Sequence, residues 1–317
     1  MESKQVEVIT LRHASGVHAS ICTYGARLHA LGYSKNSNVI VAPNETEKYY
    51  QLAGYVGATI GPLANLIRDG KIETSYETQT LDKNYGRHHL HGGRLGLDKQ
   101  HWAVALQSEE CVCLTWEEQS LGRFFVEFQI LENGLAIRYH LEAFRDLVVN
   151  MTNHAYFNLT KDRTIYRHGL HLSAKQVVST DTLNIPLDKV EHIEGTEIDF
   201  SQPKRLDFLQ LPTSIRKLSD CRGLNHCFLF EQGAQEVTLI SPENSSPNLT
   251  VKSTKPAVQL YSANNELTIN QSRNETHGAL CIEPMYSTAD QFQGDHMRSL
   301  IKRGEKYSEQ DHYLFTY

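Results

Sequence analysis

Apolar and polar side chains alternate in short runs along most of the 317-residue chain. Two such runs, residues 124–130 and 135–143, flank the dipeptide Asn133-Gly134. Period-two alternation is typical of strands with one buried face. Asn-Gly tolerates the positive φ angles that a tight hairpin turn uses. The pattern therefore predicts an antiparallel hairpin at this point of the chain.

Similar alternation recurs from one end of the chain to the other, in residues 6–11, 17–24, 237–241, 249–253 and 312–317. Only short segments, around residues 45–51 and 203–209, mix polar and apolar residues as a helix does. No Gly/Ser-rich or Pro-rich linker and no change in composition divides the chain. We therefore predict an all-β fold, a single large antiparallel β-sandwich in which residues 1–317 form one domain.

The charge balance argues against a polyanionic partner. The chain has 31 Lys and Arg against 37 Asp and Glu, a formal charge of −6, and no long block of either sign. We therefore expect no nucleic-acid binding. No leader-like apolar stretch follows the N-terminus and no run approaches 18 apolar residues, so we expect a cytoplasmic protein without a membrane span. The six scattered cysteines form no C-x-x-C pair and are interpreted as free thiols.

Histidines are densest in the segment Arg87-His88-His89-Leu90-His91-Gly92-Gly93. Strand alternation would place His89 and His91 on one face, where two imidazoles could bind a transition metal. A catalytic zinc usually has three protein ligands, and no H-E-x-x-H motif or suitably spaced carboxylate accompanies this pair. A polar substrate contact is the favoured interpretation, ahead of a metal site or a structural histidine. The two glycines would let the backbone approach a ligand closely.

A second polar cluster shares one face of a predicted strand: Asn150, Thr152, His154, Tyr156 and Asn158. Such groups are costly to bury without partners, so this face is either solvated or lines a polar pocket. Periodicity alone leaves both interpretations open.

Glu283 directly follows the apolar run 279–282. It is either an ordinary strand end at the surface or a pocket carboxylate whose raised pKa suits a general base. The sequence contains no P-loop, G-x-G-x-x-G or G-x-S-x-G motif, so nucleotide binding, hydride transfer and serine hydrolysis lack their usual support. Proton transfer is the chemistry that remains.

Several motifs together resemble the aldose 1-epimerase (galactose mutarotase) family over nearly the whole chain. They are Leu90-His91-Gly92-Gly93, Gly96-Leu97-Asp98-Lys99 with Trp102, Asn153-His154-Ala155-Tyr156-Phe157-Asn158-Leu159, Leu224-Asn225-His226, Gln259-Leu260-Tyr261 and Leu280-Cys281-Ile282-Glu283. The resemblance implies a galactose mutarotase-like supersandwich with the sugar in an open groove. It also implies an isomerase that interconverts the anomers of an aldohexose such as glucose or galactose, without a metal or an organic cofactor.

Carried over residue by residue, the resemblance makes His154 the general acid at the ring oxygen and Glu283 the general base at the anomeric hydroxyl. It assigns substrate contacts to His91, Asn65, Asn225, Gln259 and Tyr156. Ring opening needs one proton removed from O1 and one delivered to O5, which two positioned groups can do.

Two positions depart from the family pattern. Leu66 stands where the family has a sugar-binding arginine, and Arg68, two residues on, is our candidate to reach back into the groove if this segment is a strand. Asn225 replaces an aspartate and so forms a weaker, uncharged hydrogen bond. We expect altered sugar preference more than loss of chemistry.

Two alternatives stay open at this point. A non-catalytic sugar-binding protein would explain the changes at Leu66 and Asn225. A glycoside hydrolase or lyase would need a second carboxylate near Glu283, for which Glu127 and Asp290 are candidates. A phosphorylated hexose, a narrower variant of the epimerase interpretation, would need basic residues at the groove rim. The candidates are Arg68, Arg87 and Arg94, but isolated arginines near loops are more often solvated, so we do not adopt this variant.

Overall fold

Strands dominate the computed structural model, which describes residues 6–73, 78–210, 221–231, 235–265, 269, 276–287 and 299–317. The predicted central hairpin is present, because β11 (Gly122–Leu131) pairs antiparallel with β12 (Gly134–Ala143), and Leu131 lies opposite Gly134. Its turn does not use positive φ angles. Gly134 instead allows close strand packing, since a Cβ there would lie 2.0 Å from the Tyr313 carbonyl oxygen.

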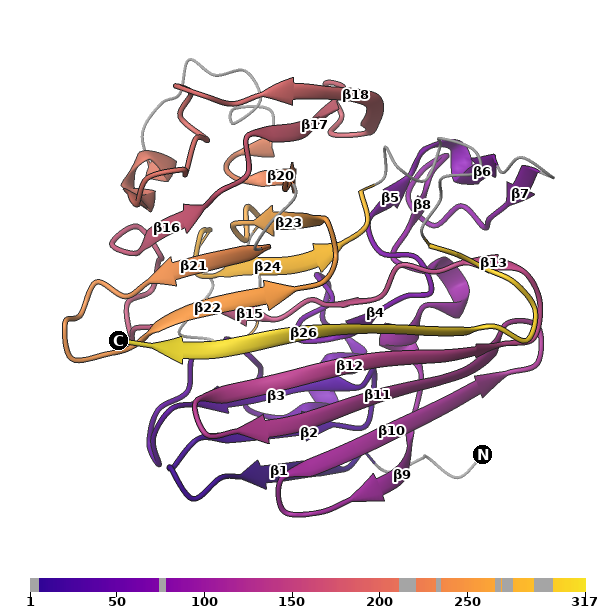
Figure 1. The fold of residues 1–317 in the computed structure, drawn as a ribbon, viewed down its shortest axis with the longest axis horizontal. Helices are drawn as coiled ribbons and strands as arrows, with labels where there is room; N and C mark the ends of the chain where they lie inside the picture. The colour runs from indigo at the N-terminus through magenta and orange to yellow at the C-terminus, as the bar shows by residue number, and fades with distance from the viewer. Residues whose placement is uncertain are drawn as a thin grey trace.

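The hairpin belongs to a nine-stranded antiparallel sheet. Its order is β19 (Lys204–Arg205), β16 (Gly169–Leu172), β21 (Glu236–Ile240), β22 (Asn248–Ser253), β26 (Lys306–Thr316), β12, β11, β10 (Cys111–Glu118) and β9 (Ala103–Gln107). The predicted strands at 237–241, 249–253 and 312–317 fall on β21, β22 and β26. Figure 1 shows β26 crossing the middle of this sheet.

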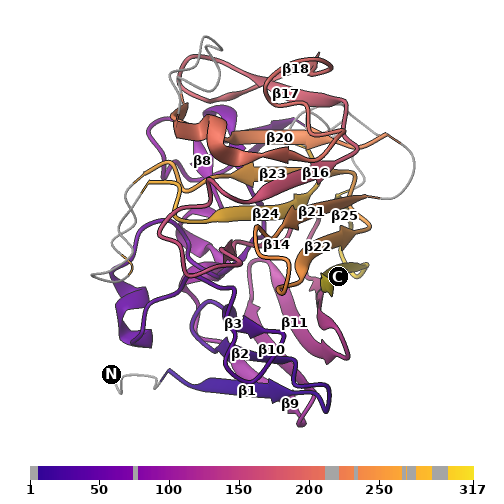
Figure 2. The same cartoon turned by 90° about the vertical axis from the view of Figure 1, so that its left-hand side faces the viewer.

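Two smaller sheets pack against the large one. The first is three-stranded: β1 (Val8–Arg12), β2 (His18–Cys22) and β3 (Arg27–Gly32). It includes the strands predicted at residues 6–11 and 17–24, and it contacts β10, β11 and β12. The second is six-stranded: β15 (Tyr156–Phe157), β24 (Leu280–Met285), β23 (Ala257–Tyr261), β20 (Asn225–Leu229), β17 (Gln176–Thr180) and β18 (Pro186–His192). Figure 2 shows it beside the β16, β21 and β22 end of the large sheet.

Short elements connect these layers. The two-stranded pairs are β4 (Thr59–Ile60) with β14 (Thr152–Asn153), β5 (Leu66–Ile67) with β8 (His89–Leu90), β6 (Lys71–Glu73) with β7 (Thr78–Thr80), and β13 (Leu147–Val148) with β25 (Leu300–Ile301). The 3-10 helices are η1 (Thr46–Tyr50), η2 (Arg68–Gly70), η3 (Gly93–Leu95), η4 (Leu97–Lys99) and η5 (Leu206–Gln210). The two predicted helical pieces correspond to η1 and η5. None of the helices in the described parts of the chain is long and apolar enough to cross a membrane.

The hydrophobic core fills the space between the sheets. Its largest cluster includes residues from Ile9 to Phe315, so the nine-, six- and three-stranded sheets share this core. The six-stranded sheet contributes Ile282, Leu260 and Phe228 to this cluster. Because successive strand residues point to opposite faces, their neighbours in the sequence project away from the core. That other face of the six-stranded sheet is the floor of a pocket.

Candidate active site

The pocket floor is a row of side chains on three adjacent strands. Glu283 on β24 lies opposite Gln259 on β23, which lies opposite Cys227 on β20. All three residues line a pocket of about 460 Å³. This volume falls within the range of small-molecule sites.

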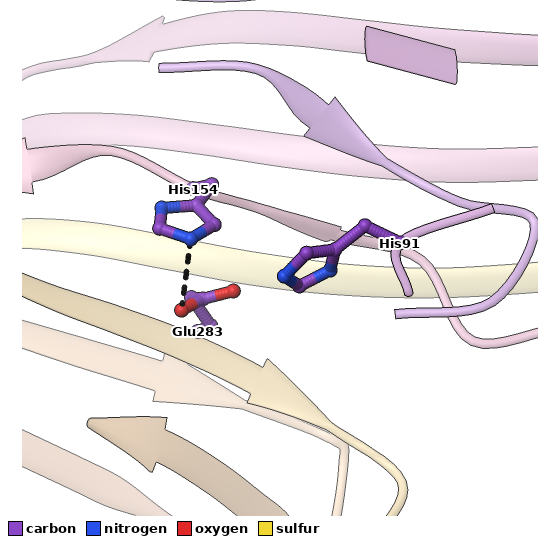
Figure 3. Close-up of side chains that lie close together, drawn as sticks. All are labelled: His91, His154 and Glu283. Atoms are coloured by element: carbon purple, nitrogen blue, oxygen red, sulfur yellow. Dashed lines mark ion pairs between the residues drawn. The ribbon is translucent and has the colours of Figure 1, made fainter. Parts of the chain in front are cut away.

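His154 stands over one end of this row. It lies between β14 and β15, where its backbone N–H donates to the Ala58 carbonyl (2.8 Å) and its carbonyl accepts from the Gly57 N–H (2.9 Å). Its ring stacks on that of Tyr156, with centroids 5.2 Å apart. The Nε2 atom lies 3.6 Å from Glu283 Oε1, and Figure 3 shows the two side chains facing each other. The fold thus brings together two groups that are 129 positions apart in the sequence.

Burial shifts the two groups in opposite directions. It lowers the pKa of His154 to about 4 and raises that of Glu283 to about 8, because a buried charge loses its hydration. Glu283 Oε2 and His154 Nδ1 are both buried without a hydrogen-bond partner. Near pH 7 the pocket therefore holds a neutral imidazole beside a protonated carboxyl group. Unsatisfied polar atoms at the base of a pocket are suited to a polar ligand.

His91 is the third group of this cluster, and Figure 3 shows its ring directed toward the other two. Its Nδ1 accepts the Asn65 backbone N–H (3.2 Å), so in the neutral ring Nε2 carries the proton and can donate it. Burial lowers the pKa of His91 well below its usual value. The ring also packs against Tyr55, with centroids 4.6 Å apart.

A chain of amide side chains extends from Asn65 across the floor. Asn65 Nδ2 donates to Gln259 Oε1 (3.0 Å), and Gln259 Nε2 donates to Asn225 Oδ1 (2.8 Å). All three residues line the pocket. An amide can donate and accept at once, so such a chain matches hydroxyl groups, which do the same.

This geometry can be compared with known proteins. The family model for aldose 1-epimerase matches residues 7–314. The chain belongs to the aldose 1-epimerase family. It is 28% identical over 281 residues to the aldose 1-epimerase of Escherichia coli strain K12, covering 83% of this chain and 80% of that protein. It is 26% identical over 329 residues to mouse galactose mutarotase, covering 98% and 94%.

Solved structures show the same fold. The galactose 1-epimerase of Lactobacillus acidophilus superposes with a TM-score of 0.86 at 24% identity, over 99% of this chain and 96% of that one. An aldose epimerase homologue from Caenorhabditis elegans gives 0.85 at 23% identity, over 99% of both chains. The all-β mutarotase-like fold predicted from the sequence is confirmed, and the protein is an isomerase of the mutarotase type.

In this epimerase the polar face predicted around His154 is buried, so the solvated interpretation is wrong. Only His154 and Tyr156 of that face line the pocket. The Tyr156 hydroxyl donates to the Gly54 carbonyl (2.7 Å), so this residue contributes its ring to the site. Asn150 and Asn158 instead hydrogen-bond backbone groups of neighbouring segments.

The histidine segment also differs from its prediction. Strand β8 ends at Leu90, and His91 has a left-handed φ of 50°, so His89 and His91 do not share a strand face. His89 Nδ1 donates to the Asp82 carbonyl (2.8 Å) away from the pocket lining. A Cβ at Gly92 would lie 1.9 Å from the Gly61 carbonyl oxygen, so this glycine permits close chain packing.

Arg68 is not in the epimerase pocket, contrary to the sequence-based hypothesis. Strand β5 ends at Ile67, and Arg68 begins a 3-10 turn in which Asp69 has a φ of 57°. The Arg68 guanidinium forms an ion pair with Asp188 at 3.2 Å. The alternation that would have returned it to the groove does not continue past Ile67.

The other charged candidates lie elsewhere as well. Glu127 pairs with Arg138 on the nine-stranded sheet, and Asp290 lies outside the described residues. Neither Arg87 nor Arg94 lines the pocket. Among the described lining residues Glu283 is the sole carboxylate, which gives no support to the two-carboxylate alternative.

Sequence reasoning assigned no role to Tyr55, Tyr261 or Arg222, all of which line the pocket of the epimerase. Tyr55 and Arg222 have left-handed backbones, with φ of 56° and 58°. Alternation cannot reveal where such residues point. Tyr261 could have been found from the sequence, because it is two residues from Gln259 on the same strand and therefore on the same face.

One metal-binding possibility is visible in this cluster. The potential ligand atoms of His91, His154 and Glu283 all lie within 4.8 Å of one another, and two histidines with one glutamate are a known zinc donor set. The hydrogen bond from Asn65 occupies Nδ1 of His91, so in the neutral tautomer that ring offers a proton at Nε2, and not a lone pair.

Proposed function

We propose that His154 and Glu283 exchange protons with an aldohexose and so interconvert its α and β anomers. The observation that carries the proposal is the 3.6 Å separation of His154 Nε2 and Glu283 Oε1, both buried, at the pocket floor. A group with a lowered pKa beside one with a raised pKa suits reversible proton exchange near neutral pH.

The reaction balances in protons. In the reactive form Glu283 is a carboxylate and His154 an imidazolium. Glu283 takes the proton from O1 while His154 gives one to O5, the C1–O5 bond breaks, and C1 becomes a carbonyl. The pair is then a carboxylic acid and a neutral imidazole, which is also its form in the empty pocket near pH 7. After rotation about C1–C2, the reverse transfers close the ring on either face.

The remaining pocket groups orient the sugar. His91 Nε2–H donates to one hydroxyl, and the amides of Asn65, Gln259 and Asn225 contact others. The reaction contains no redox or group-transfer step, so it needs neither a metal nor an organic cofactor. A cytoplasmic location stays a prediction from the sequence.

Polarimetry of freshly dissolved α-D-glucose and α-D-galactose tests the proposal. Replacing His154 with Ala or Glu283 with Gln should each lower kcat/KM by about 10²- to 10⁴-fold, because each removes one of the two proton-transfer groups. His140→Ala, a partly buried histidine of β12 outside the pocket, should retain parental activity. A Glu283→Gln variant as active as the parent would contradict the mechanism.

The same assay addresses the sugar-binding alternative. Sugar binding without acceleration of mutarotation of any aldose tested would favour a non-catalytic protein. The neighbouring acid and base at the floor support the enzymatic interpretation, because binding alone needs no matched proton donor and acceptor.

A further inference from the structure

The mouth of the pocket contains one arginine that the reaction does not use. Arg222 lines the pocket and is exposed. Among the described lining residues it is the only lysine or arginine. The amides Asn225, Asn264 and Asn265 also line the pocket and are uncharged. The pocket therefore presents a guanidinium without a neighbouring carboxylate in its described lining.

The backbone at Arg222 is held in an unfavourable conformation. Its φ of 58° lies in the left-handed region, which is strained for a residue with a Cβ. His277 Nε2 donates to the Arg222 carbonyl at 2.7 Å, and His277 Nδ1 contacts the Tyr166 hydroxyl at 3.2 Å. Strain of this kind persists where surrounding contacts impose it, and it concentrates at functional sites.

Hydrogen bonds from buried polar side chains also hold the backbone of Leu224, two residues after Arg222. The Leu224 N–H donates to Ser262 Oγ (2.8 Å), and Asn264 Nδ2 donates to the Leu224 carbonyl (2.8 Å). Ser262 Oγ donates in turn to Asn264 Oδ1 (2.5 Å), and both side chains are nearly inaccessible to solvent. The segment leading into β20 is thus rigid, and it sets the origin of the Arg222 side chain.

Arg222 is displaced from the proton-exchanging pair both across the sheet and along it, because Cys227 is level with Glu283 through Gln259 and Arg222 is five residues before Cys227. It precedes Asn225, the first residue of β20, and β23 separates β20 from β24, which carries Glu283. Two strand spacings amount to roughly 10 Å. A sugar with C1 beside Glu283 therefore presents its far end toward β20 and the segment before it.

We propose that Arg222 binds a carboxylate at the far end of the sugar, so that hexuronic acids are the preferred aldoses. The proposal rests on the proposed function, because His154 and Glu283 define the position of C1. A guanidinium matches a carboxylate in two parallel hydrogen bonds, whereas neutral hydroxyls use its charge poorly. The His154–Glu283 pair does not oppose an anion near pH 7, because both of its forms in the proposed reaction, carboxylate with imidazolium and carboxylic acid with imidazole, carry no net charge.

The test compares D-galacturonate and D-glucuronate with D-galactose and D-glucose in a mutarotation assay at pH 7. A charge-assisted contact is worth about 1.5–3 kcal/mol, so Arg222→Gln should raise KM for the uronates by roughly 10- to 100-fold. Its kcat should change less than about twofold, because the contact is remote from the reacting atoms. Arg222→Lys should recover part of the affinity. Added salt should raise KM for the uronates more than for the neutral hexoses.

Arg68→Ala is the matched control, since this arginine is ion-paired with Asp188 outside the pocket lining and should leave every KM unchanged. An unchanged uronate KM in Arg222→Gln would overturn the proposal, and so would a parent enzyme that turns over hexoses but not uronates. If the parent accelerated no aldose at all, the proposed function would fail instead. Calorimetric binding of galacturonate to the parent and to Arg222→Gln would then still decide the role of Arg222.

Discussion

This fold contains two neighbouring pairs of buried ionisable side chains. The two pairs differ in the hydrogen bonds that their members form. Lys255 Nζ contacts Asp311 at 2.9 and 3.1 Å and donates to the Pro284 carbonyl at 3.4 Å. In the other pair, His154 Nε2 lies 3.6 Å from Glu283, next along the chain to Pro284. Both pairs are nearly inaccessible to solvent, so burial alone does not distinguish a structural pair from a reactive one.

The difference lies in how fully each pair is satisfied. Asp311 Oδ1 also accepts from Ser253 Oγ at 2.7 Å, and the Lys255 ammonium lies 4.5 Å from the Tyr139 ring centroid. In the pair that we propose to be reactive, Glu283 Oε2 and His154 Nδ1 have no hydrogen-bond partner. A buried polar group whose hydrogen-bonding atoms all have partners stabilises the fold. A buried polar group that has an atom without a partner can hydrogen-bond a substrate. Between these two pairs, the unsatisfied atoms distinguish His154 and Glu283 from the structural pair, and burial does not.

The largest expected effect is the loss of stability when the Lys255–Asp311 pair is broken. Lys255→Met should lower the free energy of unfolding by about 3–5 kcal/mol, because it leaves the Asp311 carboxylate buried without its cation. Urea titration followed by circular dichroism measures the change. A second replacement, Asp311→Leu, should restore part of the loss.

The control for Lys255 lies three residues earlier on β22. Lys252 forms an exposed ion pair with Glu236 at 3.0 Å, and Lys252→Met should change stability by less than about 1 kcal/mol. Equal effects of the two lysine replacements would contradict the structural role given to the buried pair.

Glu283→Gln should have the opposite effect on stability. The folded-state pKa of Glu283 is about 8 against an ordinary value of 4.5, so between these values unfolding releases a proton. The stability that the protonated side chain contributes is complete below pH 4.5 and declines as the pH rises toward 8. Glutamine does not ionise, so the variant should gain over the parent by roughly 3 kcal/mol at pH 7. Thermal melts at pH 5, 7 and 8 measure the gain, and a gain independent of pH would refute the cause given.

The last prediction concerns the parent enzyme and involves no substitution. Its kcat/KM should depend on pH in a bell-shaped way. Below about pH 4 both His154 and Glu283 carry protons and no base remains, and above about pH 8 neither carries one and no acid remains. Activity should fall about tenfold per pH unit outside these limits, which belong to the pair as a whole. An acidic limit near 6.5, the ordinary histidine value, would show that His154 is not desolvated in the working enzyme.

Much of the fold could be predicted because many strands have one buried and one polar face. β11 and β12 alternate in this way, and their hairpin was predicted from this alternation together with the Asn133-Gly134 dipeptide. β24 is buried on both faces, so alternation gave no clue to its role. The pairing order of the sheets was also out of reach, because alternation along a strand does not name the neighbouring strand.

The site was predictable from motifs and less so from geometry. His154, Glu283, His91, Asn65, Gln259 and Asn225 were named through resemblance and line one pocket. Arg68 was misplaced because the strand argument assumed alternation beyond Ile67, where the chain turns at Asp69. Arg222 was missed because its left-handed backbone depends on contacts from His277, far along the chain.

The alternation of β24 also limits how such an enzyme can evolve. Ile282 belongs to the hydrophobic core and Glu283 to the pocket floor, so a substitution that adjusts one disturbs the packing of the other. Residues at the mouth of the pocket, such as Arg222 and Leu183, are not adjacent to a core residue on a strand of the pocket floor. Leu183 is 72% exposed. New sugar preferences can therefore accumulate at the mouth of the pocket while the strand that carries the chemistry stays nearly fixed.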